Sequence, residues 1–138
     1  MVVTRRLRLA TQGNSDVVNL TGAVEAEVAS SKLRSGVATV FIAGSTAGLT
    51  TVEYEPGVVA DLKEVFNRLV PRGLSYQHHV TAGDNNGHSH VRAALLGPSI
   101  AIPFVDGRLA LGTWQQLVLV DFDVRPRRRE LVVQIMGE

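Results

Sequence analysis

All four histidines of the chain fall within one stretch of sixteen residues, Ser75 to His90 (SYQHHVTAGDNNGHSH). The same stretch contains Asp84 and the adjacent asparagines Asn85 and Asn86. Imidazole transfers protons near neutral pH and binds divalent transition metals. A nearby carboxylate completes a coordination shell or orients a ring nitrogen. We therefore predict the functional site in this stretch, with the flanking segments as its scaffold.

The chemistry open to these histidines depends on the local backbone. His88 and His90 would share one face of a strand, whereas on a helix they would diverge by about 200°. His78 and His79 are adjacent and point apart in an extended chain, so at most one of them joins a site shared with His90. Two or three imidazoles with Asp84 or Glu53 suit a divalent metal such as zinc, nickel or manganese. The spacing matches no closed metal motif such as H-E-x-x-H. The alternative is that these polar residues cap a short helix and fill a loop.

Two further features have a structural and a functional interpretation. The arginines of RPRRR (residues 125–129) suit phosphate, because guanidinium pairs with phosphate oxygens bidentately. They equally suit a solvated turn between two strands, where alternation sends successive arginines to opposite faces. Trp114 is more typical of a core position than of a ligand platform.

The composition narrows the class of protein. The chain has 138 residues, 45% hydrophobic and 20% charged, with a net charge of +1. This length suits one domain, residues 1–138, and the near-neutral charge argues against nucleic acid or a membrane surface as partner. With no cysteine, any metal must be held by nitrogen and oxygen. The N-terminus lacks an apolar signal region and no window is long enough to span a bilayer, so we expect a cytoplasmic protein.

Alternation and helical periodicity predict the scaffold. Residues 2–10 alternate as a half-buried strand, and residues 37–43 form an apolar, β-branched strand. We expect one helix from an N-cap at Thr21 to a C-cap at Gly36, and an amphipathic helix starting at Pro56 and ending before Pro71. A short helix is expected over residues 91–96, capped by Asn85 or Asn86, and a hairpin at Asp106-Gly107.

These elements predict an α+β fold built on antiparallel sheets with two to three helices. In the strand region, GSTAG (residues 44–48) places Ser45 and Thr46 between two glycines. This is typical either of a bulge at a sheet edge or of backbone that approaches a ligand closely.

The segments GSTAGLTTVEYEPG, YQHH, GDNNGHSHVRAALLGPS, IPFVDGRLALGTWQQLVLVDFD and RPRRR, in this order, resemble the YjbQ-like family of small uncharacterised proteins. The match covers residues 37–138 and, more loosely, the first strand. The resemblance implies an antiparallel β-sandwich that assembles as a homotrimer with polar pockets between subunits. It also implies a metal or anion site at His78 and His90, with Asp84 close by.

The resemblance further implies an activity often attached to the family, secondary thiamine-phosphate synthase. Hydroxymethylpyrimidine diphosphate is joined to a thiazole phosphate, and pyrophosphate is released. On this basis His78, Asp84 and His90 are candidate catalytic residues, and the same three with His88 are candidate metal ligands. The candidate substrate-binding residues are Ser45, Thr46, Glu53, Gln115 and Arg127.

This sequence departs from some relatives at Gly44, where they carry a histidine. That departure removes one potential ligand, for which His88 or His79 would have to compensate. From the activity that the resemblance implies, the expected partner is a small phosphorylated molecule, and the expected cofactor is a divalent metal: zinc, nickel or magnesium. The alternative function is a trimer that binds a small molecule or metal without catalysis.

Overall fold

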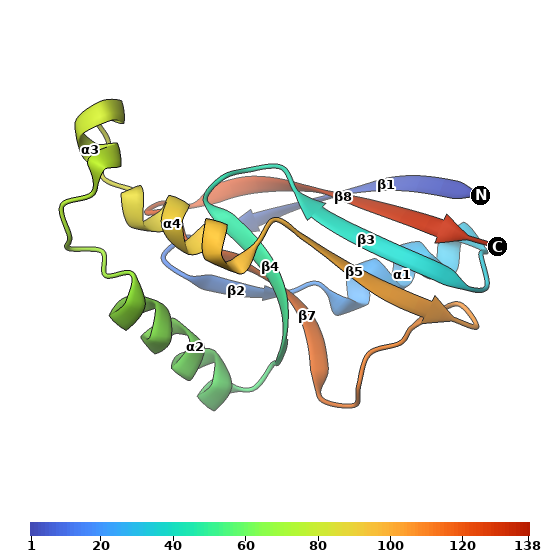
Figure 1. Ribbon diagram of the computed structural model, residues 1–138. Helices are drawn as coiled ribbons and strands as arrows, with labels where there is room; N and C mark the ends of the chain where they lie inside the picture. Colours follow the sequence, from blue (N-terminus) through green and yellow to red (C-terminus); the bar gives the residue numbers. More distant parts are fainter.

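The computed structural model describes residues 1–138, and its strands form two antiparallel sheets (Figure 1). The larger sheet has the order β1-β8-β3-β5-β6 and the smaller one the order β2-β7-β4. The larger sheet comprises β1 (Val2–Thr11), β8 (Arg127–Gly137), β3 (Gly36–Ile42), β5 (Ser99–Val105) and β6 (Arg108–Leu109). The smaller sheet comprises β2 (Asp16–Asn19), β7 (Gln115–Asp121) and β4 (Ala47–Glu53). The predicted α+β class with antiparallel sheets is confirmed.

The chain has four helices, where two to three were expected: α1 (Thr21–Ser31), α2 (Pro56–Leu69), α3 (Gln77–Ala82) and α4 (Gly87–Leu96). The additional one is α3, whose six residues are too few to show a helical period in the sequence. The amphipathic helix α2 begins as predicted, with Pro56 in its first turn and the Glu55 side chain accepting from two backbone N–H groups. None of the four helices has the length and apolar character needed to cross a bilayer.

The predicted boundaries of α1 are wrong at both ends. Thr21 is the first helical residue and not a side-chain cap; its hydroxyl instead accepts from the Leu117 N–H at 2.8 Å. The helix stops at Lys32, which adopts a left-handed φ of 64°. Gly36 lies in β3, where a Cβ would come within 1.9 Å of the Met136 carbonyl oxygen. Close strand pairing, and not helix capping, is therefore the reason for this glycine.

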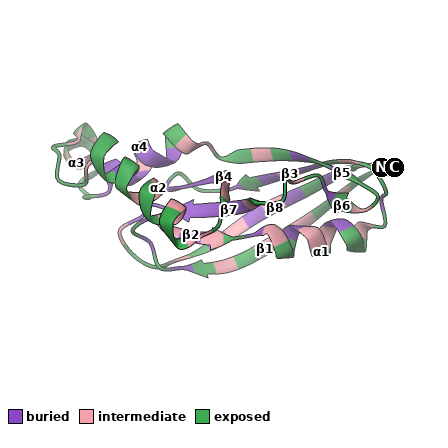
Figure 2. Cartoon of the chain, turned by 90° about the horizontal axis from the view of Figure 1, so that it is seen from below, coloured by how far each residue is buried: buried purple, intermediate pink, exposed green.

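Two hydrophobic cores hold the layers together. The first lies between the sheets and receives Val24 and Val28 from α1, Val40 from β3 and Leu131 from β8. The second lies on the other face of the small sheet, where Phe122 meets Phe66 of α2 with ring centroids 4.8 Å apart. Most buried residues lie on the strands between these layers, whereas most residues of α2 are exposed (Figure 2).

The connection between β5 and β7 contains one confirmed and one wrong prediction. Asp106 and Gly107 have φ values of 52° and 75°, as the predicted tight hairpin between β5 and β6 requires. Trp114 was expected in the core but is 73% exposed. It lies before β7 begins at Gln115, in the connection rather than in a strand, so the sheet does not turn it inward.

Candidate functional site

The structure brings together the three residues predicted to be catalytic. His78 lies on α3 and His90 in the first turns of α4, with their ring centroids 4.4 Å apart. The Nε2 atom of His78 is 2.6 Å from Oδ1 of Asp84, which lies in the connection between the two helices, and 3.1 Å from Oδ1 of Asn86. Both rings are half-buried and Asp84 is exposed. We call His78, Asp84 and His90 the histidine cluster.

A buried polar network is hydrogen-bonded to the histidine cluster through Asn86. Asn86, which contacts His78, also donates through Nδ2 to Oδ1 of Asp123 at 3.3 Å. The other carboxylate oxygen of Asp123 accepts from the Thr46 hydroxyl at 3.1 Å and from Nε of Arg127 at 2.8 Å. Two of the predicted substrate-binding residues, Thr46 and Arg127, are thus connected to His78 only indirectly, through Asp123 and Asn86.

Asp123 is ionised in this network. Burial alone would raise the pKa of its carboxyl group, because the charged form loses water. Hydrogen bonds from the Val124 N–H, Asn86, Arg127 and Thr46 outweigh that effect and lower the pKa to about 2. The carboxylate therefore fixes the orientation of Asn86 and, through it, of His78.

A second carboxylate lies beside the first. Arg129 donates to both oxygens of Asp121, from Nε at 2.7 Å and from Nη2 at 2.9 Å, and Nη2 also contacts the Thr46 hydroxyl at 2.7 Å. Thr11 donates to Asp121 at 2.5 Å. Burial opposes ionisation of Asp121, but these bonds hold its pKa below the usual value.

Asp121 and Asp123 were not predicted from the sequence, and Arg129 was expected only as one of the arginines suited to phosphate. The available indication was two aspartates flanking Phe122 at the end of an apolar strand, because a buried charge requires a partner. The expected alternation of the arginines is confirmed: Arg127 and Arg129 face the aspartates and Arg128 is exposed.

Three other predicted residues do not join the cluster. Glu53 and Gln115 pair at the far end of β4 and β7, about seven residues or roughly 20 Å along the strand from Thr46. The Gln115 side chain bonds Thr51 at 3.0 Å and Glu53 lines a separate hollow beside Trp114. Ser45 is exposed and its side chain makes no hydrogen bond. Glu53 therefore cannot replace Asp84 as a ligand beside the histidines of the same chain.

His88 is separated from His90 because both lie on a helix, where this spacing turns the rings to opposite sides. It is 2% exposed, and its Nδ1 atom is buried without a hydrogen-bond partner. Burial, followed by the charges of Arg92 and Arg72, lowers its pKa to about 4. His88 is therefore neutral at pH 7 and does not lie with the histidine cluster.

The donors present do not form a closed metal site within one chain. No group of three or more His, Asp or Glu side chains is arranged to hold a metal ion. The His78 Nε2 atom faces Asp84 and Asn86, where a ligand atom would have to face the metal. Zinc, nickel or magnesium binding stays a prediction.

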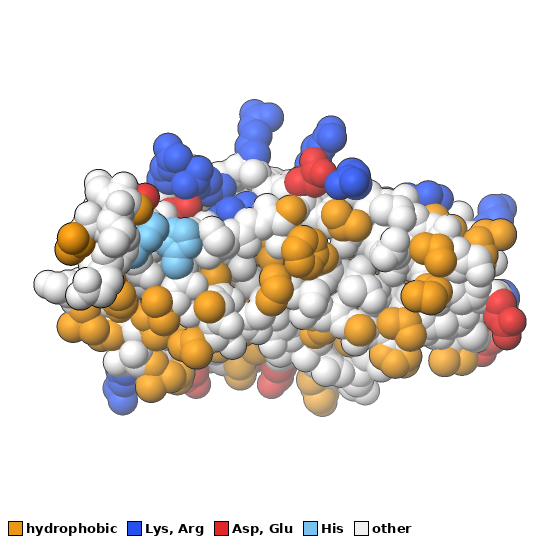
Figure 3. Space-filling model, turned by 45° about the horizontal axis from the view of Figure 1, so that its top comes forward, with side chains coloured by type: hydrophobic (Ala, Val, Ile, Leu, Met, Phe, Trp, Pro, Cys, Tyr) orange, Lys and Arg blue, Asp and Glu red, His pale blue; other side chains and the backbone are white.

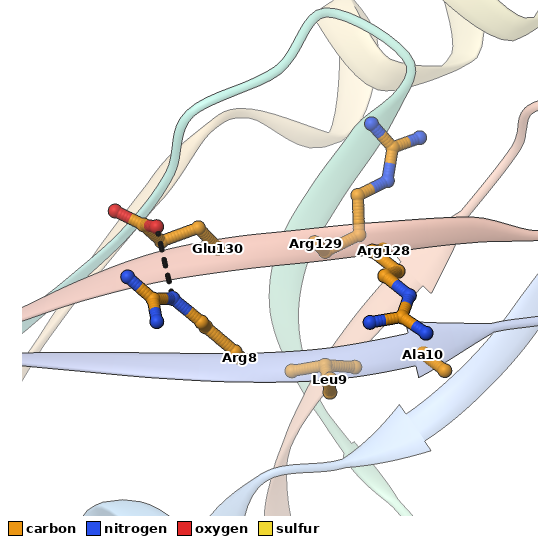
Figure 4. A pocket seen from close by; sticks show the side chains of 6 residues that line it. All are labelled: Arg8, Leu9, Ala10, Arg128, Arg129 and Glu130. Atoms are coloured by element: carbon orange, nitrogen blue, oxygen red, sulfur yellow. Dashed lines mark hydrogen bonds and ion pairs between the residues drawn. The ribbon is translucent and has the colours of Figure 1, made fainter.

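A larger hollow of about 420 Å³ lies on the strand pair β1 and β8, away from the histidines. Figure 4 shows Arg8 paired with Glu130 across these strands, and Arg128 and Arg129 leaving β8 in different directions. The Arg8–Glu130 pair is exposed to solvent, so we assign no site to this hollow.

A family model described as "UPF0047 protein YjbQ-like" matches residues 5–138. The chain belongs to the YjbQ-like UPF0047 family. A UPF0047 protein of Methanothermobacter thermautotrophicus is 35% identical over 99% of this chain and 94% of its own length. The UPF0047 protein sll1880 of Synechocystis is 39% identical over 96% of this chain and 90% of its own length.

Solved structures agree with this assignment. A YbjQ-like protein of unknown function from Sulfolobus solfataricus superposes with a TM-score of 0.94 at 30% identity, covering 100% of this chain and 99% of its own. The hypothetical protein APE1520 from Aeropyrum pernix superposes with a TM-score of 0.91 at 31% identity, covering 99% of each chain. The resemblance inferred from the motifs is thus confirmed for the family and its fold.

Proposed function

We propose that this YjbQ-like protein is an enzyme that acts on a small phosphorylated molecule at the histidine cluster. The observation that carries the proposal is the 2.6 Å contact between His78 and Asp84 with the His90 ring packed beside it. A carboxylate that holds one imidazole in place beside a second is an arrangement suited to proton transfer and to contact with anionic groups.

The reaction to test first is the thiamine-phosphate synthase reaction implied by the family resemblance. The thiazole nitrogen attacks the methylene carbon of hydroxymethylpyrimidine diphosphate; a C–N bond forms, the C–O bond breaks, and pyrophosphate leaves with the bonding electrons. The leaving group gains negative charge, so donors beside it lower the barrier. The imidazoles of His78 and His90 would donate hydrogen bonds to the diphosphate oxygens. Arg127, which is bonded to Asp123, would add a positive charge farther from the diphosphate.

We expect His78→Gln and His90→Ala each to lower the rate of thiamine phosphate formation by about 10²-fold or more, the usual contribution of a positioned acid or base. Product is measured by mass spectrometry, with chelator and with added Mg²⁺, Zn²⁺ or Ni²⁺. The matched control is His79→Gln, on the same helix. Its ring accepts from the Gly87 N–H at 3.3 Å rather than facing the cluster, and a glutamine oxygen can still accept there.

Two results would oppose the proposal: unchanged turnover in both cluster variants, or equal losses in these variants and the His79 control. Stimulation by one metal that disappears in His90→Ala would support the predicted metal site. No turnover with any metal would favour the second candidate, a trimer that binds a small molecule without catalysis. That candidate is supported by Asp123 and Thr46, which are already hydrogen-bonded within the chain.

The proposed assembly is a homotrimer formed through the outer face of the five-stranded sheet. No element of the chain covers this face, and its apolar side chains pair across neighbouring strands, as Val37 and Val2 both do with Met136. Five of them are 40–58% exposed: Val2, Val37, Phe41, Val105 and Met136. Apolar side chains spread over the face in Figure 3, with histidines at one end and basic side chains along one edge. Exposed apolar area of this kind is typical of protein interfaces, and neighbouring copies would border the histidine cluster.

We expect light scattering to give three times the chain mass of 14.9 kDa. Phe41→Asp should release monomers, because it places a charge where Phe41 meets Val132 on the face. Val65→Asp is the control: Val65 is 48% exposed but lies on α2, on the opposite side of the molecule. A monomeric wild type, or a trimer that survives Phe41→Asp, would contradict this assembly.

A further inference from the structure

A second polar pocket lies on the opposite side of α4 from His90. Its volume is about 200 Å³, and no hydrophobic residue lines it. Positive groups come from three elements: Lys63 from α2, Arg72 from the connection after α2, and Arg92 from α4 beside His88. The remaining lining is neutral and polar, formed by Asn14, Ser15 and Asn67. We call this the Arg92 pocket.

The charge of Arg92 is buried without a counter-ion. The side chain is 4% exposed and donates to the Val70 carbonyl at 3.0 Å, to Ser15 Oγ at 3.2 Å and to Asn67 Oδ1 at 3.2 Å, all uncharged acceptors. The other buried arginine, Arg129, has Asp121. Burial lowers the pKa of Arg92, yet guanidinium stays charged in proteins.

The neighbouring cations have no carboxylate partner either. Arg72 donates to the Asn14 amide oxygen at 3.0 Å, and neither Arg72 nor Lys63 belongs to any ion pair of the chain. The three positive charges around this polar space repel one another unless an anion from solution joins them. The neutral His88 ring adds a buried nitrogen, Nδ1, that still lacks a hydrogen-bond partner.

We propose that the Arg92 pocket is a binding site for a tetrahedral oxyanion, a phosphate group. Guanidinium and ammonium groups together with amide and hydroxyl groups are the donors that bind phosphate oxygens. The pocket, at about 200 Å³, is large enough to admit one phosphate group. The site is independent of the reaction proposed for the histidine cluster.

The test is calorimetric titration of inorganic phosphate into the full-length chain at pH 7.5 and constant ionic strength. We expect saturable binding, weakened at least tenfold in Lys63→Met and in Arg72→Met, since each removes a charged donor. Arg72 is exposed and Lys63 only partly buried, so these variants keep the fold even where a variant of buried Arg92 does not. The matched control is Arg68→Met, which removes a positive charge from α2 outside the pocket, where Arg68 pairs with Glu64.

A parallel titration with ribose 5-phosphate identifies the source of the phosphate group. Tighter binding than inorganic phosphate assigns the site to a phosphorylated metabolite, and weaker binding assigns it to the free ion. The proposal is overturned if the wild type shows no saturable binding at millimolar phosphate. It is also overturned if Lys63→Met and Arg72→Met bind no more weakly than Arg68→Met.

Discussion

Replacing Arg129 with methionine is expected to destabilise the protein by about 3–5 kcal/mol, because it leaves a buried carboxylate without its partner. Asp121 is 0% exposed and receives two hydrogen bonds from Arg129; only the Thr11 hydroxyl and the Asp123 N–H would remain. For a chain of this size the loss corresponds to a fall in Tm of roughly 10–20 °C. Thermal unfolding and urea titration at pH 7 measure it.

The control is Arg128→Met. Arg128 is the exposed neighbour on β8 and makes no ion pair, so its loss should change the free energy of unfolding by no more than about 0.5 kcal/mol. A second arm combines Arg129→Met with Asp121→Asn, which removes the unpaired charge and should recover part of the stability. Equal effects of the two single variants, or no recovery in the double variant, would contradict this account of the pair.

The second large effect is a loss of folding stability at acidic pH. The pKa of His88 in the folded protein is about 4, well below the ordinary 6.5, so the unfolded chain binds one more proton between these values. Stability is therefore full above pH 6.5 and falls as the pH decreases towards 4, by about 3 kcal/mol in total. Urea unfolding at pH 7.0, 5.5 and 4.5, in buffers free of phosphate and sulfate, should show this decline.

His88→Gln should remove most of that decline, whereas His79→Gln should keep it. The pKa of Asp123 is also lowered, from 3.8 to about 2, but its contribution is present above pH 3.8 and is lost only as the pH falls towards 2. The two groups therefore act in separate pH windows. A decline between pH 6.5 and 4.5 that persists unchanged in His88→Gln would show that another group causes it.

The parts of the fold that the sequence predicted well are those governed by neighbouring residues. The helix from Pro56 follows from local periodicity and a proline in its first turn, and the turn at Asp106-Gly107 follows from two residues that tolerate positive φ. The ends of α1 were wrong because contacts with distant strands decide them: Thr21 bonds Leu117, and Gly36 packs on Met136.

In the candidate site, too, residues that are close in sequence were predicted and contacts between distant residues were not. The histidines, Asp84 and the asparagines are close in sequence, so their grouping was visible as a cluster. The network behind them joins Thr46, Asn86 and Asp123, which lie 37 or more residues apart, so no spacing rule reveals it. The Arg92 pocket was missed for a related reason, since its cations come from three separate elements and only the folded chain shows that they have no counter-ion.

The position of β8 between β1 and β3 has a consequence for how the chain is made. β1 pairs with β8 from Val2↔Met136 to Thr11↔Arg127. β1 is the first strand to be synthesised and β8 the last, so β1 cannot form these backbone hydrogen bonds until β8 has been made. At a synthesis rate of roughly 5–20 residues per second, the backbone N–H and C=O groups of β1 stay unpaired for several seconds or longer. One edge of β3 also stays unpaired until then, because β8 is its partner on that side. An unpaired edge invites association with other chains. The larger sheet therefore closes only after β8 has been synthesised, and the exposure of these two edges lasts until then.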